Sequence, residues 1–322
     1  MIFQNYHKHT YWSNIKVADS ATSLEDYCIR AVELGHGIIS SVEHGWQGHY
    51  IECHQLAEKY GLKFVFGTEA YWVKDRLALD ENGHKDGSNC HIVLIAMNEN
   101  GRQAINDILS QAAIDGYYRQ SRIDLELILS LPADDVVVTS SCIAGWGYED
   151  ADSIFLRMKE HFGNNFYLEV QYHNTEPQKR LNKHLLKLKK EYGFQIIMGC
   201  DSHYIDEKGA LDRDEFIKSK GMNYPDEEGW YMDYPDGETA YKRFVEQCVL
   251  SHNEIMEAMN NTNRFLEVEE YDCPIFNHDI KMPILPEYRN LPQEERDEIL
   301  NKLIWDKWSE YKKEVPIERH NE

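Results

Sequence analysis

Residues 35–72, GHGIISSVEHGWQGHYIECHQLAEKYGLKFVFGTEAYW, contain two short apolar runs that each lead into polar residues. The first run, 37–44, ends at Glu43 and His44, and the second, 62–72, reaches Glu69. An amphipathic stretch separates the runs, as in a unit of strand, helix and parallel strand. We therefore expect a βα unit whose strands end in side chains that can bind or catalyse.

The same alternation continues to about residue 205. It predicts strands at 2–9, 37–44, 62–72, 90–97, 134–142, 165–173 and 194–204. It also predicts helices at 23–35, 100–114 and 176–193, with Ser23 as an N-cap and Gly193 behind the last one. Repeated βα units predict an α/β fold with a mostly parallel sheet, open or closed.

The pattern changes after residue 205. The remaining sequence is acidic and rich in Tyr and Trp, with helical stretches around 238–262 and 292–313. Connections that contain proline lie at positions 274, 283, 286 and 292. We interpret this region as a helical appendage to the fold.

Composition limits the classes of function. The 322 residues carry a formal net charge of −22, so the general surface should repel polyanions and any contact with nucleic acid must be local. The seven cysteines form no C-x-x-C pair, which fits a reducing compartment better than a disulfide framework. No signal peptide or membrane-spanning run is recognisable. We expect a cytoplasmic protein without a membrane partner.

Side chains that can bind metal collect at the ends of the predicted strands. In a βα barrel these ends share the face that carries the site. His91 is an exception, because it stands at the start of its strand. The residues are His7, His9, Glu43, His44, Glu69, His91, Cys142, Asp201 and His203.

Alternation along a strand directs pairs of these residues into one cavity. His7 with His9, and Asp201 with His203, are two positions apart and point the same way. A single H-x-H pair is more often an ordinary buried or solvated pair. Two such pairs together with further His, Glu and Cys favour a multinuclear metal site. Imidazole with carboxylate suits zinc, manganese or iron better than calcium or magnesium.

Seven motifs resemble a known family in their order along the chain. They are YHKHT (6–10), SSVEHGWQGHY (40–50), FGTEAYW (66–72), CHIVLIAMNENGRQAINDILSQA (90–112), SSCIAG (140–145), FYLEVQYHN (166–174) and GCDSHYID (199–206). The family is the PHP (polymerase and histidinol phosphatase) domain, and the likeness is closest to the N-terminal PHP domain of the bacterial DNA polymerase III alpha subunit. It covers about residues 3–270. Two departures are Glu43, where the family usually has Asp, and a longer segment between His9 and Asp19.

The resemblance implies a fold and a set of ligands. Residues 1–205 would form a distorted seven-stranded (β/α)7 TIM-like barrel with the metal site. Residues 206–322 would be a helical region that resembles the connection from PHP to palm in the polymerase. Two or three divalent ions (Zn, Mn or Fe) would be held by His7, His9, Asp19, His44, Glu69, His91, Cys142, Asp201 and His203.

The resemblance also implies an activity. The expected enzyme is a metal-dependent phosphoesterase, foremost a 3′-to-5′ exonuclease acting on a DNA 3′ end in replication or proofreading. A hydroxide generated at the metals would attack, and no protein nucleophile is assigned. Candidates for contact with a substrate phosphate or base are Tyr117, Tyr118, Arg119 and Arg122.

Alternatives stay open at this point. One is a phosphatase of small phosphate esters, of the histidinol phosphatase type. Another is a non-catalytic module, stabilised by metal, that docks polymerase parts. Polymerase activity is not expected from this chain alone. The chain could be free-standing, part of a split polymerase whose palm and fingers are a separate chain, or a domain excised from a longer one.

Overall fold

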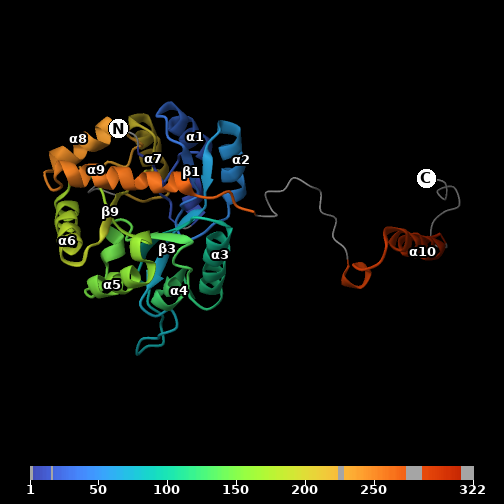
Figure 1. The fold of residues 1–322 in the computed structure, drawn as a ribbon. Helices are drawn as coiled ribbons and strands as arrows, with labels where there is room; N and C mark the ends of the chain where they lie inside the picture. The colour runs from blue at the N-terminus through green and yellow to red at the C-terminus, as the bar shows by residue number, and fades with distance from the viewer. Residues whose placement is uncertain (1–2, 16, 224–227, 273–284, 313–322) are drawn as a thin grey trace. The chain divides into compact units, whose positions relative to one another are not determined.

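The structure, a computed structural model, describes residues 3–15, 17–223, 228–272 and 285–312 (Figure 1). The chain divides into two compact units, Met1–Phe276 and Asn277–Glu322. The first unit is an α/β fold whose helices lie around a central, mainly parallel sheet (Figure 1). The α/β class predicted from the sequence is therefore confirmed.

The larger sheet has seven strands. Their spatial order is β5 (Tyr117–Tyr118), β6 (Gln120–Asp124), β3 (Gly67–Val73), β4 (Cys90–Ala96), β7 (Val136–Thr139), β8 (Phe166–Val170) and β9 (Gln195–Met198). β4 runs antiparallel to both of its neighbours, while β3 with β6, β7 with β8, and β8 with β9 are parallel. The central strands are apolar on both faces, as expected for strands that helices cover.

A second, two-stranded sheet pairs β1 (Ile38–Ser40) with β2 (Lys63–Val65) in parallel. Isolated bridges join Lys8 to Ser202 and His44 to Glu69, so the N-terminal segment and the end of β1 lie beside the large sheet. Both are single bridges, and the His44–Glu69 bridge is to β3, which lies inside the sheet. Closure into a barrel stays a prediction.

The strands differ in detail from those predicted. The described part of 2–9 makes a single bridge instead of a strand, and its polar side chains are occupied with buried contacts. The run 62–72 is divided between β2 and β3, so its two halves belong to different sheets. The short hairpin of β5 and β6 was not predicted, because two to five residues are too few for a clear alternation.

The helices of the first unit follow the predicted caps. Ser23 accepts a hydrogen bond from the Asp26 backbone N–H, and Gly193 adopts the left-handed conformation (φ +67°) that ends its helix. The helices are α1 (Leu24–Glu33), α2 (Tyr50–Tyr60), α3 (Glu99–Ile114), α4 (Leu125–Leu129), α5 (Ala151–Phe162), α6 (Glu176–Tyr192), α7 (Glu207–Ser219), α8 (Gly237–Gln247) and α9 (His252–Asn261).

The first unit extends beyond the boundary expected at 205/206. α9 packs against β9, where Asn261 Nδ2 donates to the Ile196 carbonyl at 2.7 Å, and Gln247 on α8 donates to the Gln171 carbonyl at 3.0 Å. These buried hydrogen bonds tie α8 and α9 to the sheet. The predicted helical stretch 238–262 thus corresponds to α8 and α9, which belong with the α/β fold.

The second unit contains α10 (Gln293–Tyr311), which matches the helix predicted at 292–313. Pro286 and Pro292 precede it, whereas the connections predicted at 274 and 283 lie outside the described residues. Among the described residues, no helix has both the length and the apolar character that a membrane span requires.

Candidate metal centre

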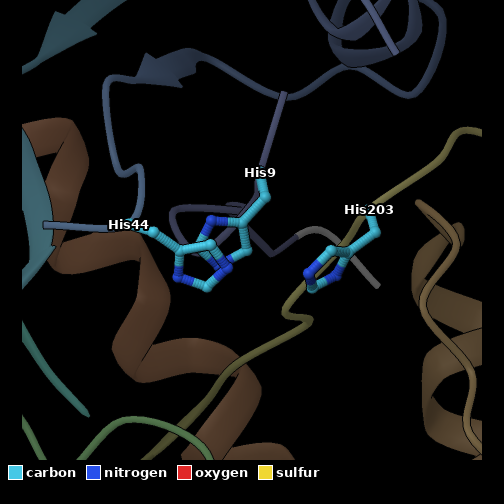
Figure 2. Close-up of side chains that lie close together, drawn as sticks. All are labelled: His9, His44 and His203. Atoms are coloured by element: carbon cyan, nitrogen blue, oxygen red, sulfur yellow. The ribbon is translucent and has the colours of Figure 1, made fainter. Parts of the chain in front are cut away.

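Three histidines from distant parts of the sequence meet in the first unit (Figure 2). His9 lies just before the 3-10 helix Tyr11–Ile15, His44 follows β1, and His203 follows β9. One nitrogen of each ring lies within 4.8 Å of the others, and all three side chains are buried. The rings of His9 and His44 are stacked, with centroids 3.9 Å apart.

Asp201 joins the two histidines of the H-x-H pair. Its Oδ1 lies 3.2 Å from His9 Nε2 and 3.5 Å from His7 Nε2. Asp201 has a φ of +48°, which is uncommon for a residue other than glycine. Such backbone strain gathers at functional sites, where the surrounding structure enforces it. Here it places the carboxylate against both imidazoles.

Glu69 on β3 is the centre of the cluster. Its Oε2 lies 2.7 Å from His44 Nδ1 and 3.3 Å from His9 Nε2. Its Oε1 lies 3.0 Å from His91 Nδ1 and 3.2 Å from His7 Nε2. One buried carboxylate therefore contacts four imidazoles.

The direction of β4 explains why His91 belongs to this site although it begins its strand. β4 runs antiparallel to β3, and His91 pairs with Tyr71 near the carboxyl end of β3. An antiparallel strand brings its own amino end to the edge where its parallel neighbours finish. His91 therefore reaches the same face as the residues that end the other strands.

Cys142 follows β7 and lies beside Glu69 and His91. Its Sγ lies 3.5 Å from His91 Nδ1 and 3.8 Å from Glu69 Oε1. Burial, with the nearby charge of Glu69, raises the pKa of the Cys142 thiol well above its usual value. Without a cation beside it, the sulfur stays protonated.

Asp19 lies in the loop before α1 and contacts His203 and His44. Its Oδ2 is 2.8 Å from His203 Nε2 and 3.6 Å from His44 Nε2. Arg213 on α7 holds the other oxygen of Asp19 at 2.6 Å and its backbone carbonyl at 2.7 Å. With Asp19, all nine side chains predicted as ligands lie in one connected cluster.

The cluster has the properties that a metal site requires. Several buried atoms form only ion-pair contacts that lack hydrogen-bond geometry, and a buried polar atom that nothing satisfies costs about 1–3 kcal/mol. Imidazole nitrogen, carboxylate oxygen and thiol sulfur together match zinc, manganese or iron. The residues present therefore fit divalent metal ions. The atoms outside hydrogen-bond geometry are His7 Nε2, His9 Nε2 and Asp201 Oδ1, together with His44 Nδ1 and Glu69 Oε2, which face each other at 2.7 Å.

Charge within the cluster sets the protonation of its members. Burial raises the pKa of Glu69, but the neighbouring histidines lower it well below its usual value. Burial lowers the pKa of His44, but Asp19 and Glu69 raise it to about 10. For His9, burial and the charge of His44 lower the pKa. Protons thus occupy some of these imidazoles, and a cation has to displace them.

The structure adds polar residues behind the cluster that sequence reasoning did not assign. Glu169 on β8 contacts His7, Ser13 contacts His9, and Arg213 contacts Asp19. Glu169 carried a signal, because it is a carboxylate within the apolar strand FYLEV. Ser13, four residues after His9, and Arg213, 194 residues after Asp19, stand in no recognisable motif and carried none.

The four predicted substrate contacts lie on and around the β5–β6 hairpin. Tyr117 and Arg119 are exposed, and the Arg119 guanidinium lies 5.5 Å from the centre of the Tyr118 ring. Arg122 is different, because it is only 2% exposed.

The hydrogen bonds of Arg122 leave no N–H group of its guanidinium available for a phosphate. Its guanidinium has five N–H groups. They donate to four backbone carbonyls and to the side chain of Asn89. The prediction of Arg122 as a phosphate contact is therefore not supported, whereas Tyr117, Tyr118 and Arg119 stay predictions.

A comparison with family models identifies the family of the chain. The model described as PHP domain matches residues 5–173, which is more than half of the chain. The chain belongs to the PHP domain family. The match spans the first eight of the strands described above, and the family resemblance read from the motifs is thereby confirmed.

The chain is similar in sequence to DNA polymerase III alpha subunits and in structure to a PHP-like protein. DNA polymerase III subunit alpha of Borreliella burgdorferi is 30% identical over 292 residues, which are 88% of this chain and 25% of that protein. The subunit of Campylobacter jejuni is 27% identical over 286 residues, 82% of this chain and 23% of that protein. The chain thus spans about a quarter of the length of these relatives. A two-domain protein from Bacteroides vulgatus, described as containing a predicted PHP-like metal-dependent phosphoesterase, has a TM-score of 0.36 and 14% identity, covering 77% of this chain and 70% of that one.

Proposed function

We propose that this PHP domain protein is a metal-dependent phosphoesterase that removes nucleotides from a DNA 3′ end. The observation that carries the proposal is the cluster of nine His, Asp, Glu and Cys side chains, with buried atoms that have no hydrogen-bond partner. We also propose that two or three ions of zinc, manganese or iron bind there. Bound divalent ions would activate water and neutralise phosphoryl oxygens.

The residues of the chain have defined parts in this proposal. Glu69, Asp201 and Asp19 supply the negative charge that holds cations, and the histidines supply the neutral nitrogens. Cys142 is a ligand candidate and not a nucleophile, because burial keeps its thiol protonated when no cation is near. Six of the nine residues are buried, which strengthens the electrostatic interactions among them, while Asp19, His91 and Asp201 are partly exposed.

The choice of DNA as the substrate rests on the relatives. Both are polymerase III alpha subunits, and the matched segment is long enough to include α7 to α9 as well as the metal cluster. We propose a role in replication or proofreading in the cytoplasm, with a palm-bearing chain as a partner. In this proposal the barrel is closed, and the region from 206 onward leads toward that partner.

The experiment compares hydrolysis of a single-stranded oligonucleotide by the wild type with hydrolysis by His9→Ala and Asp201→Ala, in zinc or manganese. We expect both variants to lose more than about 100-fold, since even indirect partners of ligands cost about 10–100-fold. His84→Ala serves as the matched control, because His84 is exposed and its ion pair is with Asp80, which is not a cluster residue. Full activity in His9→Ala and Asp201→Ala would disprove the proposal.

A phosphatase of small esters is the second candidate. The net charge of −22 favours a small substrate over a long polyanion. Faster turnover of a phosphomonoester than of the oligonucleotide, with the same loss in Asp201→Ala, would select it. A chain that binds metal and hydrolyses neither substrate would instead fit a docking module that metal stabilises.

A further inference from the structure

Two buried carboxylates stand behind the H-x-H pair, and neither belongs to the nine-residue cluster. Glu169 is on β8 and Glu43 follows β1, with exposures of 1% and 0%. Glu169 contacts His7 directly, and Glu43 reaches His9 through the hydroxyl of Ser13. Each histidine of the pair is therefore backed by a carboxylate on the side away from the cluster.

Glu169 fixes the proton of His7. Its Oε1 lies 2.8 Å from His7 Nδ1 and accepts from Gln171 Nε2 at 2.9 Å. Its Oε2 accepts from the Tyr6 hydroxyl at 2.7 Å and from Thr139 Oγ1 at 2.9 Å. Three donors other than His7, which are Tyr6, Thr139 and Gln171, suit an ionised carboxylate, which can only accept. The nitrogen of His7 that faces Glu169 must therefore carry a proton.

Gly199 leaves the space that the Glu169 carboxylate occupies. A Cβ at residue 199 would lie 1.9 Å from Glu169 Oε1 and 2.3 Å from its Cδ. Only glycine lets the backbone between β9 and Asp201 approach so closely. The carboxylate is thus held between His7 and the segment that carries another cluster residue.

The hydroxyl of Ser13 fixes the proton of His9 by the same logic. Ser13 Oγ lies 2.5 Å from Glu43 Oε2, 3.1 Å from His9 Nδ1 and 3.3 Å from the His44 backbone N–H. A hydroxyl has one proton to donate and two positions that accept. Its proton goes to Glu43, which also accepts from Thr10. His9 Nδ1 must therefore donate to Ser13.

Both arrangements leave Nε2 as the free nitrogen. His7 Nε2 and His9 Nε2 are buried, make no hydrogen bond and lie 3.5 and 3.2 Å from Asp201 Oδ1. A lone pair on either nitrogen would repel this carboxylate oxygen unless a proton or a metal cation lies between them. A hydrogen bond at the other ring nitrogen is also the usual way in which proteins orient metal-binding histidines.

We propose that Glu169 and Glu43 are positioning residues that hold His7 and His9 in the Nδ1–H tautomer and present both Nε2 atoms to a divalent ion. The inference rests on the proposed function, because it assigns these carboxylates to the same site. It adds two residues that touch neither substrate nor metal and act through the histidines.

The test measures zinc affinity of the full chain, with zinc alone as the probe in a chelator competition. Glu169→Gln removes the negative charge that faces His7 Nδ1, and Ser13→Ala removes the link to Glu43. We expect each to weaken zinc binding about 10–100-fold. Tyr6→Phe and Thr10→Val are matched controls. Tyr6→Phe removes a hydrogen bond to Glu169 and Thr10→Val removes one to Glu43, but each leaves the contact that reaches the histidine. We expect the controls to bind zinc almost as the wild type does.

A second measurement needs no variant, so it decides the matter even if Glu169→Gln does not fold. Nitrogen-15 NMR of the zinc-loaded wild type should show protonated Nδ1 in His7 and His9 with Nε2 bound to zinc. Zinc on Nδ1 of either ring, or equal losses of affinity in Glu169→Gln and Tyr6→Phe, would overturn the inference. Wild-type protein that gives the expected NMR result but hydrolyses no phosphate ester would refute the proposed function alone.

Discussion

At the scale of single residues, the neighbours of an imidazole decide what it does in this molecule. His36 is buried beside the hydroxyl of Tyr234, 2.7 Å from its Nδ1, and burial with the charge of Arg30 lowers its pKa to about 4. His44 is buried as well, yet two carboxylates raise its pKa to about 10. The first is a neutral core residue, and the second belongs to a charged cluster.

The low pKa of His36 predicts a pH dependence of stability. The folded pKa is about 4 and the unfolded value is about 6.5, so between these values the unfolded state binds more protons. Stability from neutral His36 is thus complete above pH 6.5 and falls by up to about 3 kcal/mol as the pH drops through 4. Urea unfolding at pH 7.5 and 4.5 should show a smaller loss in His36→Gln than in the wild type. The same loss in both proteins would contradict the assignment.

The hydrogen bonds of Arg122 predict a structural effect of its removal. Arg122→Gln leaves several buried carbonyls without a donor, so we expect unfolding free energy to fall by about 3 kcal/mol or more. Arg119→Gln is the comparison, because Arg119 is exposed and should change stability by less than about 0.5 kcal/mol. Thermal unfolding of Arg122→Gln and Arg119→Gln measures the loss of stability in each variant. Equal stability of the two would show that Arg122 is not structural.

At the scale of elements, the sequence predicted where strands lie better than how they run. Period and composition located the stretches that contain β3, β4, β7, β8 and β9. They carry no information on direction, so the reversed course of β4 and the entry of His91 into the cluster needed the structure. The motif resemblance nevertheless named all nine residues that meet. Glu169 was not assigned to His7 because the two lie 162 residues apart, and Ser13 was missed because the Glu43 carboxylate that it links to His9 lies 30 residues away.

The contact between α3 and the start of β7 predicts a strict limit at Gly101. A Cβ there would lie 2.1 Å from the Asp135 carbonyl oxygen, which is backbone and cannot turn away. Gly101→Ala should therefore lower unfolding free energy by about 1–3 kcal/mol, although alanine favours helices. Gln103→Ala, at an exposed position of α3, should have little effect or stabilise. Chemical denaturation compares them, and a stabilised Gly101→Ala would refute the close packing.

At the scale of the whole molecule, the cluster draws on a long stretch of chain but belongs to one unit. Its residues run from His7 to His203, and Arg213 on α7 adds a further tie. All of them lie within Met1–Phe276, while α10 lies in the second unit. Metal binding should therefore be coupled to the folding of the first unit, because the ligands come together only when its sheet forms.

This coupling predicts how metal acts on the full-length chain. A ligand that binds the folded state at 100 times its dissociation constant adds about 2.7 kcal/mol of stability. Zinc or manganese should therefore slow amide hydrogen exchange in β3, β4 and β9, and a chelator should reverse this. Exchange in α10 should not change, because no cluster residue lies in its unit. In Asp201→Ala the metal effect on the sheet should disappear, whereas His84→Ala should keep it. Equal protection of α10 and the sheet would mean that the two units respond to metal as one.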